Sequence, residues 1–207
     1  MLIMKIIIAS SNPWFSINEE LNIDNEICFI KNKSELNLEK IRRFNPKLIF
    51  FTHWSWMVPS EIYLEYDCIL FHTAPLPFGK GGSPIQNLIL LGYKNSPVCA
   101  LKMIDKLDSG PIYGKKNLSL EGPLSLIFKN LNIIVNDFIS ELIINLPDPV
   151  PQEGEEFFFK RLNNEDNWIP IESSLLEIFN RIRMLDDPSY PSAKIKFGNF
   201  YIELKTQ

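Results

Sequence analysis

The sequence predicts an α/β protein: a parallel sheet covered by helices, with a small C-terminal extension made of a helix and a hairpin. Three observations support this fold class. Short β-branched runs alternate with amphipathic helical stretches, as in parallel sheets with helices on their faces. A long amphipathic helix follows them. A proline-rich segment then separates that helix from one more helical stretch and two strand-like runs.

The first predicted strand is residues 4–9, a β-branched run that stops in a turn at Ser10, Ser11, Asn12 and Pro13. Because the run is apolar throughout, we expect it to be buried. Four further runs of the same character are expected as strands: residues 26–30, 47–52, 67–72 and 97–103.

The stretches between these runs place apolar residues at helical spacing, so each is expected to cover the sheet with one face. Ser34 is the expected N-cap of the first helix, and Pro59 the first-turn residue of the second. The predicted helices are residues 34–44, a short one from residue 59, 84–91 and the long helix 123–146.

Three prolines, Pro147, Pro149 and Pro151, cannot continue the long helix, because proline lacks a backbone N–H and restricts its predecessor. We therefore predict a core of residues 1–146 and an extension of residues 147–207. The extension is expected to hold a helix and a β-hairpin that turns at Gly198 and Asn199, over residues 172–185, 193–197 and 200–204.

Composition excludes several classes of protein. With 207 residues, 45% apolar residues and a net charge of −4, the chain is typical of globular proteins, not of disordered, collagen-like or disulfide-dense ones. An acidic total disfavours a polynucleotide partner. The three isolated cysteines are expected to be reduced core thiols, and no metal-ligand spacing occurs. The first apolar run is too short to span a membrane, so we expect a cytoplasmic protein without membrane contact.

Ligands of open parallel sheets bind beyond the carboxyl ends of the strands. Three predicted strand ends carry polar residues there, and both histidines of the chain are among them. Histidine can accept and return a proton near neutral pH, and a carboxylate can orient its ring. We therefore expect His72 and Asp108 to form a catalytic pair, with His53 a second candidate.

Two neighbouring segments have a functional and a structural interpretation. The Gly-rich residues 79–83 could bind an anion through backbone N–H groups, or form a mobile turn. Trp54 and Trp56 could line a pocket, or belong to the core. The pair Arg181 and Arg183 is expected on a solvated face.

Three motifs in order along the chain resemble those of the formyltransferase family that uses 10-formyltetrahydrofolate. They are His72-Thr73-Ala74-Pro75-Leu76-Pro77, Gly81-Gly82-Ser83-Pro84-Ile85-Gln86 and Leu107-Asp108-Ser109-Gly110. The likeness covers most of the chain, since the segments at Trp54, Trp168 and Tyr190 also resemble the family. The family includes methionyl-tRNA, glycinamide-ribonucleotide and nucleotide-sugar N-formyltransferases. It implies a Rossmann-like formyltransferase core over residues 1–146.

The resemblance implies that 10-formyltetrahydrofolate is the co-substrate and that no metal takes part. A neutral amine would attack the formyl carbon, with His72 accepting its proton or stabilising the oxyanion, and Asp108 orienting His72. The folate would lie against Lys102, Met103, Ile104, Asp105, Leu107 and Gly110. The acceptor would approach His53, Trp54, Ser55, Trp56, Thr73, Gly81, Gly82 and Asn87.

One position departs from the family pattern. Leu70 stands where the family has the asparagine that holds the oxyanion, and loss of one such donor costs about 3 kcal/mol. The replacement donors that we consider are His53, Thr73, Asn87 and the backbone N–H groups of the Gly81-Gly82 loop.

We expect the acceptor to be a nucleotide-linked amino sugar, as in surface-glycan or nonulosonic-acid synthesis. Methionyl-tRNA is disfavoured because the chain is acidic and ends soon after the long helix. Two alternatives stay open: a non-catalytic protein that binds folate or nucleotide sugar, and a 10-formyltetrahydrofolate hydrolase. The apolar residues of segment 175–204 suggest a homodimer.

Overall fold

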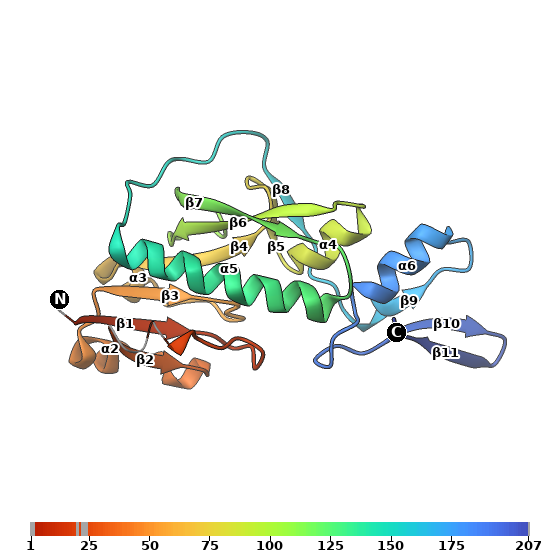
Figure 1. Ribbon diagram of the computed structural model, residues 1–207, viewed down its shortest axis with the longest axis horizontal. Coiled ribbons are helices and arrows are strands. Elements are labelled where there is room, and N and C mark those ends of the chain that lie inside the picture. Colours follow the sequence, from red (N-terminus) through yellow and green to blue (C-terminus); the bar gives the residue numbers. More distant parts are fainter. Residues whose placement is uncertain (1–2, 20, 22–24, 207) are drawn as a thin grey trace. The chain divides into compact units, whose positions relative to one another are not determined.

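The largest sheet of the described structure has six strands in the order β2-β1-β3-β4-β6-β7 (Figure 1). The computed structural model describes residues 3–19, 21 and 25–206. The chain divides into two compact units that alternate along the sequence. The first comprises Met1–His72, Val98–Lys116 and Asn132–Glu153, and the second Thr73–Pro97, Asn117–Leu131 and Gly154–Gln207. The division into a core and an extension at residue 146 stays a prediction.

Four of the predicted strands form the parallel part of the sheet, which confirms the fold class. Their buried β-branched and aromatic side chains suit a sheet covered on both faces. In register, Ile7 lies opposite Cys28 on one side and Ile49 on the other, and Ile49 lies opposite Cys68. These strands are β1 (Met4–Ala9), β2 (Asn25–Ile30), β3 (Leu48–Phe51) and β4 (Cys68–Thr73).

The fifth predicted strand is present as β6 (Asn95–Lys102), but its expected direction is wrong. Met103, just past its end, donates its N–H to the carbonyl of Cys68 at the start of β4, at 2.8 Å. The strand therefore runs antiparallel to β4. Its neighbour β7 (Ile112–Ser119) was not predicted, because its burial alternates and its sequence is largely polar.

The first helical prediction is wrong at its beginning. Ser34 lies in a 3₁₀ turn (Lys33–Glu35), and α2 (Leu38–Phe44) starts after it. Asn37 is the N-cap, since its side chain accepts hydrogen bonds from the N–H groups of the second and third residues of the helix. Pro59 precedes α3 (Ser60–Glu65) as its N-cap residue and does not lie in the first turn.

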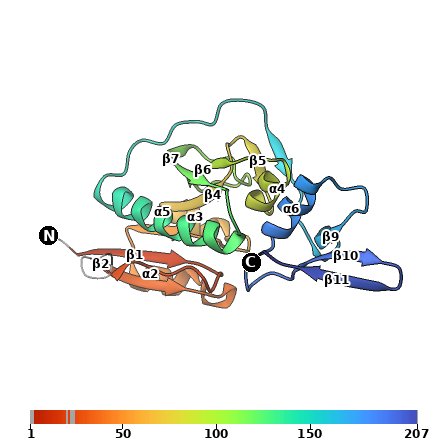
Figure 2. The ribbon, with the colours of Figure 1, turned by 45° about the vertical axis from the view of Figure 1, so that its right-hand side comes forward.

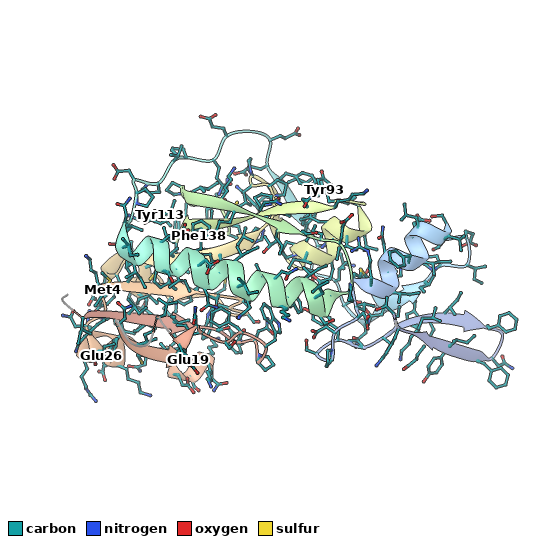
Figure 3. The ribbon with its side chains drawn as sticks, in the orientation of Figure 1. Met4, Glu19, Glu26, Tyr93, Tyr113 and Phe138 are labelled. Carbon is teal, nitrogen blue, oxygen red and sulfur yellow. The ribbon has the colours of Figure 1, made fainter. Side chains whose placement is uncertain are left out.

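The long helix is α5 (Leu124–Ile144), as predicted (Figure 2). In the first unit its Phe138 ring lies 5.7 Å from the ring of Phe71 on β4. A β-carbon on Gly114 of β7 would lie 3.1 Å from Phe138, so the helix packs closely on that strand. Figure 3 labels Phe138 on this helix and Tyr113 on β7, the residue that precedes Gly114.

The second unit contains a short parallel pair that corrects the prediction for the Gly-rich segment. Residues Phe78–Gly81 form β5, which pairs with β8 (Phe157–Phe159). Gly81 has a φ of +93°, and a β-carbon there would lie 2.8 Å from the carbonyl oxygen of Phe159. Helix α4 (Pro84–Leu90) follows. The glycines therefore serve a close approach between two strands.

The C-terminal part of the second unit contains the predicted helix, α6 (Leu175–Arg183), and the predicted hairpin. The hairpin, β10 (Ala193–Phe197) and β11 (Phe200–Leu204), forms a three-stranded sheet with β9 (Trp168–Ile169). The expected solvation of Arg183 is wrong: its guanidinium is buried and donates to the carbonyls of Leu120 and Gly122.

Many apolar side chains of this C-terminal part are exposed, and the homodimer expected from them stays a prediction. They include Trp168, Leu175, Leu176, Phe179, Phe197, Phe200, Tyr201 and Ile202. Within the described part of the chain, no helix combines the length and the apolar character that crossing a bilayer requires.

Candidate active site

His72 lies near the end of β4, where the alternation of the strand decides the direction of its side chain. Its neighbour Phe71 packs between Phe50 and Phe138, on the face that α5 covers. Since successive side chains of a strand point to opposite faces, His72 shares the other face with Leu70. The imidazole is buried, with 8% of its surface exposed.

Asp108 meets His72 on that face. Its Oδ2 lies 3.6 Å from Nδ1 of His72, and its side chain is equally buried, at 9% exposure. The separation is longer than a hydrogen bond, and such contacts are often loose before substrate binds. A carboxylate in this position can orient the imidazole and stabilise its protonated form. The pair can therefore take a proton from an attacking nucleophile and pass it on.

The loop between β6 and β7 carries Asp108 to His72 by an unexpected route. We expected both residues at carboxyl ends of parallel strands, but the antiparallel β6 ends beside Cys68, at the other end of β4. Cys68 and His72 are four residues apart, which is about 13 Å along a strand. The loop therefore has to extend along β4 and return, since Lys102 N–H donates to Pro111 O at its base, at 2.9 Å.

Gln152 holds this loop, and sequence reasoning missed it. Its Nε2 donates to the carbonyl oxygens of Asp108, at 2.8 Å, and of Gly110, at 2.9 Å. The backbone of Asp108 is left-handed, with a φ of +48°, which non-glycine residues seldom adopt. The sequence offered no signal for Gln152, because a single glutamine beside a proline-rich segment has no motif.

His53 follows β3, and its ring is enclosed by aromatic side chains. The ring centroid lies 4.2 Å from that of Trp14 and 6.2 Å from that of Phe15. Burial lowers the pKa of His53 to about 3, because the charged form would lose its hydration. Its Nε2 is buried and has no hydrogen-bond partner among the described residues. His53 is therefore neutral at physiological pH and suited to donate or accept a hydrogen bond.

The tryptophan pair after His53 is in part a core element. Trp54 lies edge-on to Trp56, with ring centroids 4.9 Å apart, and packs against the buried apolar cluster of the first unit. Trp56 is partly exposed. Ser55 lies 3.0 Å, oxygen to oxygen, from Ser11, whose hydroxyl also donates to the His53 carbonyl at 2.7 Å. These contacts place hydroxyl groups and an exposed indole beside the ends of β1 and β3.

Leu70 packs against the same buried cluster, which includes Ile49, Phe51 and Cys68. An apolar side chain cannot supply the N–H that the family obtains from its asparagine. Among the replacement donors considered, Asn87 already donates its amide to three backbone carbonyls of the second unit. His53 has a buried nitrogen without a partner in the described structure.

The residues predicted to bind folate differ in exposure. Ile104, Asp105 and Leu107 are exposed, and Lys102 lies 3.9 Å from the carboxylate of Asp67. Met103 packs against the buried cluster. Gly110 is buried at the base of the loop. Exposed apolar side chains next to Asp108 suit a flat aromatic ligand.

Four predicted acceptor-binding residues belong to the second unit. Thr73 is the buried last residue of β4, and Asn87 lies in α4. Gly81 ends β5, and a β-carbon on Gly82 would lie 2.5 Å from Cβ of Arg161. Packing thus accounts for both glycines, and their role in binding stays a prediction. Over the described ranges, no group of three or more His, Cys, Asp or Glu side chains could hold a metal ion.

A family model and a curated protein that match this chain are both described as methionyl-tRNA formyltransferase. A family model described as the C-terminal domain of methionyl-tRNA formyltransferase matches residues 164–207. The methionyl-tRNA formyltransferase of Malacoplasma penetrans (strain HF-2) is 28% identical over 183 residues, which are 84% of this chain and 58% of that protein. The chain thus spans less than two thirds of the length of this curated relative.

Several similar solved structures cover nearly the whole chain, and two of them show the range of likeness. One, described as a methionyl-tRNA formyltransferase from Clostridium thermocellum, has 40% sequence identity and a TM-score of 0.92, covering 99% of this chain and 92% of that one. The other, a sugar N-formyltransferase from Shewanella sp. FDAARGOS_354, has 15% identity and a TM-score of 0.69, covering 98% and 97%. The second likeness concerns the fold alone.

Proposed function

Because the chain belongs to the formyltransferase family, we propose that it transfers a formyl group from 10-formyltetrahydrofolate to the amino group of an acceptor. The observation that carries this proposal is the buried pair of His72 and Asp108, with 3.6 Å between Nδ1 and Oδ2. An amine nucleophile has to lose a proton as it attacks a formyl carbon. A buried imidazole beside a carboxylate supplies the base.

The proposed reaction forms a C–N bond between the acceptor nitrogen and the formyl carbon, and breaks the bond from that carbon to N10 of the folate. His72 takes the proton from the attacking amine. It then returns that proton to N10, so that tetrahydrofolate leaves neutral at this nitrogen. Asp108 keeps the ring oriented through both transfers. His53, neutral and beside the end of β3, is our preferred donor to the oxyanion in place of the family's asparagine.

We assign the folate to the loop between β6 and β7. Ile104 and Leu107 expose apolar surface there, and Leu107 directly precedes Asp108. A flat pterin ring gains affinity by covering such side chains. Gln152 and Gly110 keep the loop close to the sheet. The loop would thus hold the formyl donor beside His72.

For the acceptor, we propose a nucleotide-linked amino sugar. The exposed Trp56 and the hydroxyls of Ser11 and Ser55 suit a sugar or a base, since indole rings pack on both and hydroxyls bond to neutral polar groups. The net charge of −4 favours a small acceptor over a polynucleotide. Methionyl-tRNA is the second candidate, because relatives with 28 and 40% identity carry that name.

One competition assay distinguishes these acceptors. The protein is incubated with 10-formyltetrahydrofolate and a mixture of UDP- and dTDP-amino sugars and methionyl-tRNA, and products are identified by mass. We expect one sugar to gain a formyl group, and no product with His72→Gln. Formylation of methionyl-tRNA alone would replace the proposed acceptor. Formate without a formylated product would indicate a hydrolase, and saturable folate binding without turnover a binding protein.

A further inference from the structure

Gln152 links the segment after α5 to the loop that carries Asp108. Two residues before it, Val150 exchanges both backbone hydrogen bonds with Ile112, at 2.7 and 2.9 Å. This bridge fixes the backbone of the segment against the first residue of β7. From there the side chain of Gln152 reaches the carbonyls of Asp108 and Gly110. The segment therefore restrains the loop from outside its own sequence.

The two bonds define the orientation of the Gln152 amide. Both acceptors are carbonyl oxygens, so only the NH₂ group can face them. The amide oxygen is buried and has no hydrogen-bond partner within the described residues. All the bonds that hold this side chain in the described structure thus go to the Asp108 loop. An amide at this position leaves its oxygen buried without a partner in the described structure, a cost that an apolar side chain would avoid. The two bonds that restrain the loop explain why an amide is nevertheless present.

We propose that Gln152 is a positioning residue for the reaction: it stabilises the left-handed backbone of Asp108 and thereby keeps Oδ2 against Nδ1 of His72. This inference rests on the proposed formyl transfer. The loop has to extend along β4 to reach His72, and Asp108 adopts a φ of +48° there. Without the bond from Gln152, the turn loses one restraint, and the carboxylate moves away from the imidazole.

The decisive variant is Gln152→Glu, which keeps the size of the side chain and places oxygens against both carbonyls. Gln152→Met removes the two donors without adding charge. The matched control is Asn136→Asp, because the buried amide of Asn136 also donates to two backbone carbonyls, those of Ser16 and Asn132, at 2.9 and 2.8 Å. The control breaks the same kind of contact elsewhere in the first unit, between helix α5 and the segment at Ser16 and within the helix itself.

We expect both Gln152 variants to lower kcat by about 10- to 100-fold, because a shift of about 1 Å at a reacting group has effects of this size. KM for the acceptor should change little, since Gln152 contacts neither the acceptor nor the residues proposed to bind it. KM for the formyl donor should rise, because the loop that Gln152 holds also carries the proposed folate site. Hydrogen exchange of residues 103–111 should accelerate. The ¹⁵N shifts of the His72 ring should move toward a mixture of tautomers, and the two histidines of the chain make the assignment simple. Asn136→Asp should change neither the ring shifts nor the exchange of this loop.

Two results would overturn the inference. One is wild-type exchange and ring shifts in both Gln152 variants. The other is a loosened loop with unchanged kcat, which would mean that the position of Asp108 is irrelevant to the rate. If the wild-type chain transfers no formyl group at all, the proposed function fails, and the exchange and ring-shift measurements still decide whether Gln152 positions Asp108.

Discussion

The carbonyl oxygen of Lys102 lies 1.7 Å from the position that a β-carbon on Gly110 would occupy. No side chain can be accommodated at that distance from a backbone atom. The contact closes the loop that carries Asp108, because the adjacent Pro111 carbonyl accepts the N–H of Lys102. Gly110 is therefore required by the path of the chain.

We predict that Gly110→Ala lowers the free energy of unfolding by about 3 kcal/mol, because the backbone of the loop or of β6 has to move. The control is Gly198→Ala in the hairpin turn, where φ is +60° and no atom lies within 4 Å of the added carbon. Its cost should be about 1 to 2 kcal/mol, from backbone conformation alone. Urea unfolding measures both. If both variants lost the same free energy of unfolding, the contact between Gly110 and the Lys102 carbonyl would not be the reason for the glycine.

Burial of His53 predicts a pH dependence of stability. The pKa of His53 falls from 6.5 to about 3 on folding. Between these values the unfolded chain binds a proton at His53 and the folded chain does not, so stability falls as the pH decreases from about 6.5. The slope for one group is at most about 1.4 kcal/mol per pH unit.

The test compares wild type with His53→Asn, since asparagine tolerates the φ of +52° at this position. Between neutral pH and pH 5, wild type should lose up to about 2 kcal/mol more than the variant in its free energy of unfolding. Parallel curves for the two proteins would mean that His53 protonates as easily in the folded state as in the unfolded one.

The strands of the parallel sheet could be predicted because burial on both faces leaves a continuous apolar run, as at Ile6, Ile7 and Ile8. The direction of β6 could not be predicted, since a buried strand has the same apolar run whether it is parallel or antiparallel to its neighbour. Strand β7 escaped prediction because Lys115 and Lys116 interrupt its apolar residues. Strand β5 was not predicted because it contains Gly79 and Gly81, and glycines with positive φ are typical of turns.

At the candidate site, the identities of the catalytic residues were easier to predict than the path of the chain that brings them together. His72 and Asp108 were selected for their residue types, and the structure brings them together through the return of the loop, not through adjacent strand ends. Gln152 lies 44 residues from Asp108 in sequence, and its role becomes visible only after folding. Likewise, only packing shows why Gly82 must be small.

The apolar packing of Leu70 predicts the outcome of restoring the family's asparagine. Leu70→Asn should lower the free energy of unfolding by about 2 kcal/mol, because an amide replaces a side chain packed on the buried cluster. It should not raise kcat if His53 supplies the oxyanion donor. Leu64→Asn, at an 80% exposed position, is the control, with an expected change within about 0.5 kcal/mol. A faster Leu70→Asn enzyme would show that the site lacks a donor.

The central claim is that His72 and Asp108 act as one catalytic unit, and a double-mutant cycle on kcat tests it most directly. We predict that His72→Asn lowers the rate of formyl transfer by about 1,000-fold and Asp108→Asn by about 100-fold. The double variant should be no slower than His72→Asn alone, because Asp108 acts only through the ring. Reductions that multiply in the double variant, or a wild-type rate in either single variant, would contradict the claim.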